Sequence, residues 1–377
     1  MQLTRPPLHN PLQTWDIFCR VIDNYGDAGV CWRLARQLAK AHGRTVRLWI
    51  DDLGTLQALC PALLPDMPRQ AHAGIEICHW PENFPDTAPA DVVIEAFACH
   101  LPQRYLHAMA ARRAPPRWLN LEYLSAEAWV ADCHGLASPH PSLPLTKYFF
   151  FPGFTAATGG LLRESAVPPD IPTSAPHTSD ACNTLNLFCY AHAPAPALLE
   201  ALRDSPQNWQ INVSPGQARE ALGMQFSTPP GGNGPRQPGN IRIGTLPFLT
   251  PDAYDAQLRQ GTLNIVRGED SFVRAQLAGR PFLWHIYPQE GNAHLDKLNA
   301  FLDLYTALLS PRLAQTVREM FLAWNTPLSP EHLAACWQNF HPALPLLAEH
   351  ARNWQTHCQQ LPELSKALID FCRKLPP

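Results

Sequence analysis

An apolar strand pattern that runs through an acidic turn into an amphipathic helix opens the chain at residues 15–38. Four apolar residues make the strand pattern: Ile17, Phe18, Val21 and Ile22. The helical spacing begins after the turn at residues 23–29 (DNYGDAG). In α/β sheets a turn of this kind lies at the carboxyl end of a strand, where ligands bind. Because its two carboxylates would repel a phosphate, the turn indicates a place where a polar or cationic acceptor is held and deprotonated.

Length and composition favour two folded domains. The 377 residues are too many for one ordinary core, and a net charge of -3 gives no sign of attraction to nucleic acid or to a membrane. The sequence has neither an apolar run of membrane-spanning length nor the apolar segment of a signal peptide. Its eleven cysteines form no CxxC pair. We therefore expect a cytoplasmic protein with reduced thiols.

Strand and helix patterns alternate along both halves of the chain, which predicts doubly wound α/β sheets. The later strands of the first half are expected at residues 45–50, 75–80, 92–97, 117–121 and 147–151, and those of the second half at 185–190, 209–213, 241–246, 263–266 and 281–287. Helices are expected at residues 52–60, 101–113, 126–131, 196–203, 253–259 and 270–278.

The same pattern divides the chain into domains. Residues 1–163 are expected to form one Rossmann-like domain and residues 185–343 a second, joined by a linker at 164–184 that is rich in Pro, Ser and Thr. A stretch without a core pattern, residues 225–240, predicts a loop. Terminal helices within residues 344–377 are expected to cross back and brace both domains.

A second polar turn, residues 267–271 (RGEDS), follows a strand of the second half and suits a nucleoside diphosphate. Ser271 is a candidate helix cap, and the amides after it would point at phosphate oxygens. Arg267 could add charge-assisted hydrogen bonds to that group. Glu269 suits sugar hydroxyls better than phosphates. Tyr190, at the end of the first strand of the second half, and Phe248, after another strand, could flank a base or a sugar.

Two long runs, WDIFCRVIDNYGDAGVCWRLARQL and IVRGEDSFVRAQLAGRPFLWHIYPQEGNAHLDKL, closely resemble the protein-arginine rhamnosyltransferases that modify bacterial elongation factor P. The segments between them (EAFACHLP, WLNLEYLSAE, KYFFFPGF, LFCYA, GTLPF) follow the order of that family. The resemblance implies an α/β fold of the GT-B type, with two facing Rossmann-like domains. It also implies inverting, metal-independent transfer of L-rhamnose from dTDP-β-L-rhamnose to an arginine guanidinium of elongation factor P, without a cofactor.

The resemblance carries over to individual residues. Asp27 matches the general base of the family, and Asp23 matches its second essential turn acid. Donor-binding and catalytic-cleft positions are matched by Tyr190, Phe248, Arg267, Glu269, Asp270 and Ser271. Where the family often has a glutamine, three residues after Phe248, this chain has Pro251. A donor contact through that side chain is therefore not implied here.

The chemistry of an arginine acceptor agrees with an acidic turn. A guanidinium has a pKa above ~12, so it is deprotonated only as the new bond forms. Paired carboxylates would hold it, orient one nitrogen and take the proton. Glu122 and Tyr123, at the end of a strand, are candidates for further acceptor contacts. No metal cage is expected, because the residues of each Cys-His dipeptide (Cys78-His79, Cys99-His100, Cys133-His134) point to opposite faces of a strand.

Simpler interpretations of these residues stay open at this point. Asp27 could cap a helix beginning at Ala28, Asp23 could bond its own turn, and Arg267 could pair with a neighbouring carboxylate. Glu269 could be a solvated loop charge, and Tyr190 and Phe248 could be core aromatics. Two rival functions also remain: a GT-B enzyme with another nucleotide sugar and a non-protein acceptor, and a non-catalytic nucleotide-sugar-binding protein.

Overall fold

The computed structural model describes residues 12–23, 25–164, 182–223, 239–326 and 328–375. Chain contacts divide it into two units: the first comprises Met1–Leu124, Trp129–Ser165 and Pro362–Pro377, and the second Ser125–Ala128 and Ala166–Leu361. Most of the expected linker at residues 164–184 and most of the expected loop at residues 225–240 lie outside the described residues.

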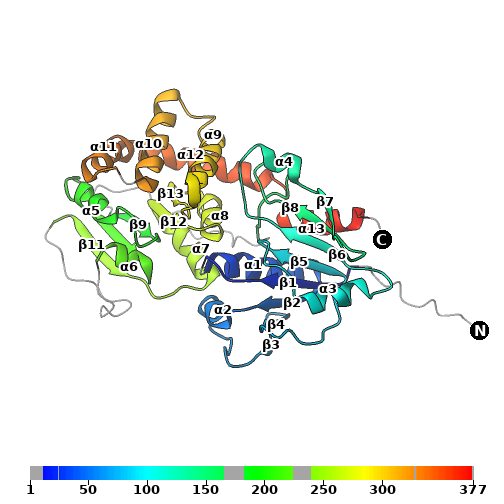
Figure 1. Cartoon of the computed structure of the whole chain (residues 1–377). Coiled ribbons are helices and arrows are strands. Elements are labelled where there is room, and N and C mark those ends of the chain that lie inside the picture. The colour runs from blue at the N-terminus through cyan, green and yellow to red at the C-terminus, as the bar shows by residue number, and fades with distance from the viewer. Residues whose placement is uncertain (1–11, 24, 165–181, 224–238, 327, 376–377) are drawn as a thin grey trace, which may run out of the picture. The chain divides into compact units, whose positions relative to one another are not determined.

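The first unit is built on a sheet of eight strands in its described part, ordered β3-β4-β2-β1-β5-β6-β8-β7 (Figure 1). The inner strands β4, β2, β1, β5, β6 and β8 are parallel, while β3 and β7 pair antiparallel at the two edges. The strand bounds are β1 Thr14–Cys19, β2 Thr45–Ile50, β3 Arg69–His72, β4 Ile75–His79, β5 Val92–Ala96, β6 Arg117–Leu121, β7 Ala137–Pro139 and β8 Thr146–Phe150.

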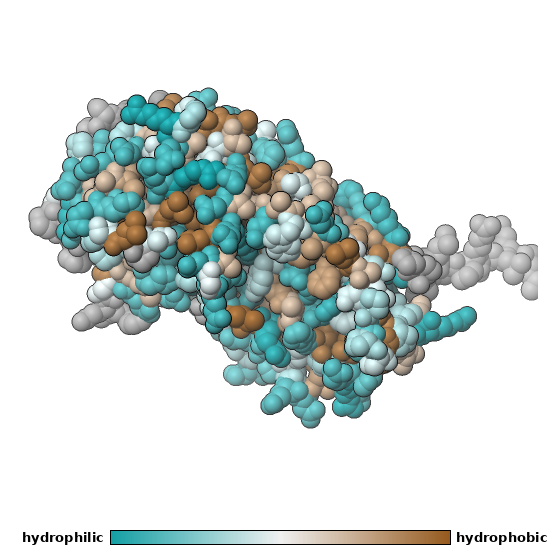
Figure 2. All heavy atoms as spheres, turned by 45° about the horizontal axis from the view of Figure 1, so that its top comes forward, coloured by the Kyte–Doolittle hydropathy of each residue, from teal (hydrophilic) through white to brown (hydrophobic). Residues whose placement is uncertain are grey.

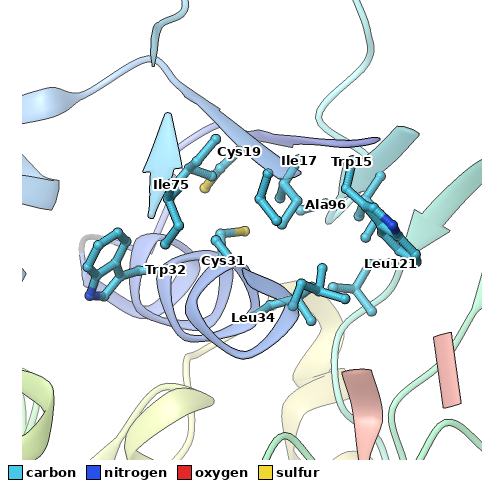
Figure 3. Close-up of a cluster of buried hydrophobic side chains, with 14 of the residues drawn as sticks. Trp15, Ile17, Cys19, Cys31, Trp32, Leu34, Ile75, Ala96 and Leu121 are labelled. Atoms are coloured by element: carbon cyan, nitrogen blue, oxygen red, sulfur yellow. The ribbon is translucent and has the colours of Figure 1, made fainter. Parts of the chain in front are cut away.

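Helices cover both faces of this sheet because side chains alternate along its strands. Trp15, Ile17 and Cys19 of β1 pack into a core with α1 (Figure 3), whereas Phe18 lies in a separate core with Tyr105 of α3. The apolar positions of α1 recur at helical spacing and are buried. The helix bounds are α1 Tyr25–His42, α2 Leu53–Leu59, α3 Gln103–Ala110, α4 Trp129–Cys133 and α13 Leu364–Lys374.

The second unit has a five-stranded, all-parallel sheet in its described part, ordered β11-β10-β9-β12-β13. The strands are β9 Asn183–Leu187, β10 Trp209–Val213, β11 Ile241–Thr245, β12 Leu263–Arg267 and β13 Phe282–His285. The helices are α5 Ala195–Arg203, α6 Gln217–Ala221, α7 Pro251–Gln260, α8 Asp270–Leu277, α9 Ala293–Tyr305, α10 Pro311–Asn325, α11 Pro330–Phe340 and α12 Leu344–Gln360. In the interior, the side-chain nitrogen of Asn186 on β9 donates to the side-chain oxygen of Asn264 on β12 at 2.8 Å. This hydrogen bond helps fix the register of the two strands.

Each sheet reverses its strand order once beside its first strand. In the first unit, β2 and β4 lie on one side of β1, and β5, β6 and β8 lie on the other. In the second unit, β10 and β11 lie on one side of β9, and β12 and β13 lie on the other. Ligands of doubly wound sheets bind at such reversals, outside the carboxyl ends of the strands. The two polar turns of the sequence follow β1 and β12 and therefore lie at these two points.

Most expected strands and helices are confirmed, and the differences have local causes. The first strand ends at Cys19 and excludes Val21 and Ile22, because the Val21 amide donates to the Asp51 carboxylate at 2.9 Å. The prediction missed β3, β7 and the short helix α6. Both missed strands are antiparallel edge strands of at most four residues, too short to show a clear alternation.

The surface of the described chain mixes polar and apolar side chains, and Figure 2 shows both kinds interspersed on the face it presents. Ile22, just before the acidic turn, is 65% exposed. Isolated apolar side chains of this kind are ordinary on protein surfaces. No helix among the described residues has the length and hydropathy needed to cross a membrane.

The chain returns to the first unit through a close backbone contact before α13. The Leu161 amide donates to the Pro362 carbonyl, and the Leu364 amide donates to the Leu161 carbonyl, each at 3.0 Å. Gly160 has a φ of +70°, and a Cβ placed on it would lie 1.9 Å from the Pro362 oxygen. Glycine is therefore required here both for its conformation and for its lack of a side chain.

We predict that Gly160→Ala destabilises the first unit by about 2–5 kcal/mol, because backbone strain adds to a clash that only a shift of the chain can relieve. The matched control is Gly74→Ala, whose φ of +79° is similar but whose Cβ would meet no atom within 4 Å. It should lose only about 1–2 kcal/mol. Chemical denaturation of both variants checks this, and equal losses would contradict it.

Candidate active site

The carboxylate of Asp27 is the most deeply placed acid of the first polar turn. Asp27 lies in the first turn of α1 and is 2% exposed. The backbone amides of Ile22 and Asp23 both donate to its Oδ2 at 2.9 Å, and the hydroxyl of Tyr123 donates to its Oδ1 at 3.2 Å. Because α1 begins at Tyr25, the alternative of Asp27 as cap of a helix starting at Ala28 is wrong. Its carboxylate instead folds the preceding turn back onto the helix.

Burial raises the pKa of Asp27 above its ordinary 3.8, although its three hydrogen-bond donors act in the opposite direction. The nearby Asp51 carboxylate raises that pKa further. A carboxylate that binds a proton more tightly than usual is a stronger base, and perturbed groups of this kind gather at functional sites. The position therefore suits a group that accepts a proton during a reaction.

Asp23 lies in the same turn as Asp27, so the structure brings together the two acids expected to act as a pair. The Asp23 amide bonds the Asp27 carboxylate, and its carbonyl accepts a hydrogen bond from Gly26 at 2.8 Å. Asp23 is half-buried. Asp23 belongs to the loop between β1 and α1, and Asp27 to the first turn of α1, so both lie at the strand-order reversal of the first unit.

The two candidate acceptor residues after β6 differ in their surroundings. Tyr123 bonds Asp27, and its ring stacks on Phe97 with centroids 4.4 Å apart and planes 13° apart. Glu122 accepts a hydrogen bond from the amide nitrogen of Asn120. Its half-buried position raises the pKa of the Glu122 carboxyl. The structure thus joins Tyr123 directly to the Asp27 site.

The turn after β5 is strained and anchored. Phe97, Ala98 and His100 have φ values of 56°, 53° and 53°. Residues with a side chain rarely adopt this left-handed conformation, which costs about 1–3 kcal/mol of strain for each residue. Two buried polar residues hold the turn: the Ala98 amide donates to Asn120 Oδ1 and the His100 amide to Glu95 Oε1, each at 3.1 Å. Strain that is anchored in this way is typical of functional sites.

In the second unit the guanidinium of Arg267 is the centre of the other polar turn. Arg267 ends β12 and is 6% exposed. Its guanidinium carbon lies 4.5 Å from the centroid of the Tyr190 ring and 4.9 Å from that of Phe188. One terminal nitrogen, Nη1, is buried with no hydrogen-bond partner among the described residues. A buried cationic donor without a partner is costly unless a ligand completes it.

His285, at the end of β13, holds Tyr190 in place. Its Nδ1 accepts the Tyr190 backbone amide at 3.2 Å, and its ring meets the Tyr190 ring edge-on at 5.0 Å. Burial, followed by the charges of His192 and Arg267, lowers the pKa of His285 to about 3. The imidazole is therefore neutral at physiological pH, which keeps Nδ1 free to accept that amide.

The acids of the second turn are both paired. Glu269 Oε1 lies 2.6 Å from the Lys297 ammonium on α9, and Asp270 lies 3.6 Å from the Arg274 guanidinium. Ser271 is 9% exposed, but it is not the helix cap: α8 begins at Asp270 and Glu269 occupies the cap position. The expectation for Ser271 as cap is wrong: α8 begins at Asp270, where the helix at residues 270–278 was expected to begin, so Ser271 lies inside the helix and not before it. Ser271 still lies in the first turn of α8, where amides are free to bind an anion.

Phe248 and Pro251 belong to the connection between the edge strand β11 and α7, and to the start of α7. Phe248 follows the edge strand β11, which is separated from β9 by β10, and it is 38% exposed. Pro251 begins α7, with the Thr250 side chain as the cap of that helix. Among the described residues, no group of three or more His, Cys, Asp or Glu side chains is arranged to hold a metal ion.

Several residues of both sites were not expected from the sequence: Glu95, Phe97, Asn120, Phe188, His285 and Lys297. Two of them carried a usable signal. Glu95 is a charged residue inside an otherwise apolar strand (VVIEAF), and His285 stands inside another (PFLWHIY). Buried ionisable residues at strand ends are rarely there without a partner.

These features define a class of protein before any relative is considered: two doubly wound α/β units, one with a buried carboxylate and one with a buried guanidinium, each at a strand-order reversal. Solved structures of the same class agree. The structure titled "Structural basis for EarP-mediated arginine glycosylation of translation elongation factor EF-P" matches with a TM-score of 0.63 and 30% identity, covering 96% of this chain and 99% of that one. Spinosyn rhamnosyltransferase SpnG complexed with thymidine diphosphate matches with a TM-score of 0.52 and 14% identity over 95% of this chain and 99% of that chain, which shows the fold alone. The expected α/β fold of GT-B glycosyltransferases is confirmed.

Sequence comparisons identify the family. The model of the family described as "Elongation-Factor P (EF-P) rhamnosyltransferase EarP" matches residues 15–373. The protein-arginine rhamnosyltransferase of Pseudomonas putida is 43% identical over 96% of this chain and 98% of its own length. That of Neisseria meningitidis serogroup B is 37% identical over 97% of this chain and 98% of its own. The chain therefore belongs to the EarP family of protein-arginine rhamnosyltransferases, and it is an enzyme of the glycosyltransferase class.

We predict that Asp27→Asn folds at least as stably as the wild type near neutral pH. The folded state holds the Asp27 proton more tightly than the unfolded chain, so wild-type stability falls as pH rises through 3.8 and beyond. The amide of the variant does not titrate, and its oxygen can still accept both backbone amides. Urea denaturation between about pH 4 and pH 7 should show the variant gaining stability relative to the wild type as pH rises. The opposite trend would contradict a raised pKa at this site.

Proposed function

We propose that this protein transfers L-rhamnose from dTDP-β-L-rhamnose to an arginine guanidinium of elongation factor P, with inversion and without a metal ion, in the cytoplasm. The observation that carries the proposal is the buried Asp27 carboxylate, held by three uncharged donors at the carboxyl end of β1. Membership of the family supports the acceptor and the sugar.

The acceptor half of the reaction needs a base that also attracts a cation. In our proposal Asp27 and Asp23 bind the guanidinium, which orients one nitrogen toward the anomeric carbon. As that nitrogen forms the C–N bond, the bond from the anomeric carbon to the diphosphate oxygen breaks. The nitrogen proton passes to Asp27, whose raised pKa makes it a better acceptor. One displacement inverts the anomeric centre, so no covalent enzyme intermediate forms.

The donor half needs positive charge for the leaving diphosphate. Arg267 has a buried nitrogen with no partner in the described part of the chain, and the amides of the first turn of α8 follow it directly. Together these groups can stabilise the charge that develops on the diphosphate. Lys297 neutralises Glu269, which reduces its repulsion of phosphate and leaves it able to bind sugar hydroxyls. Tyr190, Phe248, Asp270 and Ser271 complete the donor-binding residues of the proposal.

We predict that incubation of this protein with elongation factor P and dTDP-β-L-rhamnose adds one deoxyhexose mass to the acceptor, on an arginine. The Asp27→Asn variant should transfer at least about 100-fold more slowly, as expected on loss of a general base. Intact-mass and peptide mass spectrometry measure both quantities.

The same experiment separates the rival functions. Transfer to elongation factor P from a different nucleotide sugar would show that the proposed donor is wrong. No transfer to elongation factor P by a folded preparation would show that the proposed acceptor is wrong. Binding of a dTDP-sugar without transfer to any acceptor would identify a non-catalytic binding protein. Asp27→Asn would then have no effect on turnover, because there would be none.

We predict that Arg267→Gln weakens binding of dTDP about 10- to 100-fold, because the diphosphate loses a charge-assisted hydrogen bond inside a buried site. A ligand that binds the native state raises the melting temperature, so titration with dTDP followed by thermal shift gives the affinity. The matched control is Arg242→Gln, an exposed arginine on the edge strand β11. Equal affinities of the wild type and Arg267→Gln would exclude Arg267 from the donor site.

A further inference from the structure

We infer that Phe97 is a positioning residue: its ring, presented by the strained turn after β5, holds the Tyr123 hydroxyl on the Asp27 carboxylate and so sets the basicity of Asp27. This inference rests on the proposed role of Asp27 as the base. Phe97 has no polar side-chain atom with which to bond Asp27 or to take a proton. It acts through Tyr123, which lies 96 residues from Asp27 in the sequence.

The first step of the argument is the ring stack. Phe97 and Tyr123 lie nearly parallel, with centroids 4.4 Å apart and an angle of 13°. Phe97 is buried and belongs to the same core cluster that Tyr123 packs against. A tyrosine ring pressed flat against a fixed neighbour can rotate little about its own side-chain bonds. The stack therefore restricts where the Tyr123 hydroxyl can lie.

The second step is the way in which Phe97 is held. Its backbone is left-handed, and its amide donates to the Leu121 carbonyl at 2.7 Å, which ties it to the strand that leads to Tyr123. The next residues are fixed by Asn120 and by Glu95, a carboxylate that also accepts the Trp118 indole N–H at 3.1 Å. An ordinary core phenylalanine does not require a left-handed backbone at its own position and at two of the next three residues. The strain is explained if the turn must place this ring at one orientation.

The third step connects the hydroxyl to proton transfer. A hydrogen bond donated to a carboxylate favours its charged form, and Tyr123 acts in this direction on Asp27. If Phe97 no longer fixes Tyr123, Asp27 loses that donor for part of the time and its pKa rises. The other groups around Asp27 are the Asp51 carboxylate after β2, Asp23 in the same turn, and the buried thiols of Cys19 and Cys31. The hydrogen bond with Cys31, followed by burial, raises the pKa of Cys19, so the Cys19 thiol stays protonated.

The test is a proton titration of Asp27 in the free enzyme, followed by side-chain 13C NMR of aspartate-labelled protein. The Asp27 signal is assigned by its absence in Asp27→Asn, and the Asp23 and Asp51 signals are followed separately. Tyr123→Phe should raise the Asp27 midpoint by about one pH unit. Phe97→Leu should raise it in the same direction, by at least about half as much, and Phe97→Tyr, which keeps a flat ring, should leave it near the wild-type value.

The double variant decides the mechanism. If Phe97 acts through Tyr123, Phe97→Leu adds nothing to the midpoint in the Tyr123→Phe background, so the two effects are fully coupled. A further rise in the double variant, or no rise in Phe97→Leu alone, would overturn the inference. Should Phe97→Leu fail to fold, Phe97→Met, closer in volume, takes its place with the same expectation.

The matched control is Phe84→Leu. Phe84 is also a buried aromatic residue of the first unit, but it packs in the other core against Trp49, at 4.8 Å, and Tyr105. The Phe84→Leu substitution should lower the free energy of unfolding without moving the titration midpoint of Asp27. The acid limb of kcat/KM should shift with the titration midpoint in each variant. Because the titration needs no substrate, a failure to transfer rhamnose would refute the proposed function and leave the inference on Phe97 separately testable.

Discussion

Parallel strand pairing is the constraint on which the sites of both units depend. Parallel neighbouring strands are joined by a helix that crosses one face of the sheet. In a doubly wound sheet the strand order reverses once, so that helices cover both faces. In this protein the reversals fall between β1 and β5 and between β9 and β12. The loops that follow the two strands beside a reversal lead to opposite faces of the sheet, which leaves a crevice between them. Polar groups in that crevice stay available to ligands. The Asp27 and Arg267 sites both stand at such a point.

Burial of Asp27 shows how the fold balances stability against chemistry. Desolvation disfavours the carboxylate, and two backbone amides and one phenol offset part of that effect. None of these donors carries a charge, so the full negative charge of the carboxylate is kept for a cation. A buried ion pair at the same place would be more stable locally, but it would compete with a guanidinium acceptor. Residues that an enzyme needs for its reaction often lower the stability of its folded state in this way.

The sequence predicted the two polar turns and every strand of both sheets except the short edge strands β3 and β7, because periodicity and turn residues are local signals. It failed where the decisive partner is distant. The strand pattern included Ile22, which the Asp27 carboxylate instead binds through its backbone amide. The partnership of Tyr123 with Asp27 spans 96 residues, and Arg267 meets Tyr190 only because β9 and β12 are neighbours. Such pairs depend on strand order, which no local pattern states.

In the function proposed above, the two units use one architecture for ligands of opposite charge, and the difference lies in which charges are already neutralised. In the second unit the acids beside the ligand turn each contact a base, Glu269 with Lys297 and Asp270 with Arg274, while a nitrogen of Arg267 has no partner among the described residues. A ligand at this turn therefore meets a net positive charge. In the first unit the donors to Asp27 are uncharged, so a ligand meets the net negative charge of the carboxylate. Because like charges repel strongly where water is excluded, each turn selects its ligand by the charge its neighbours leave unbalanced.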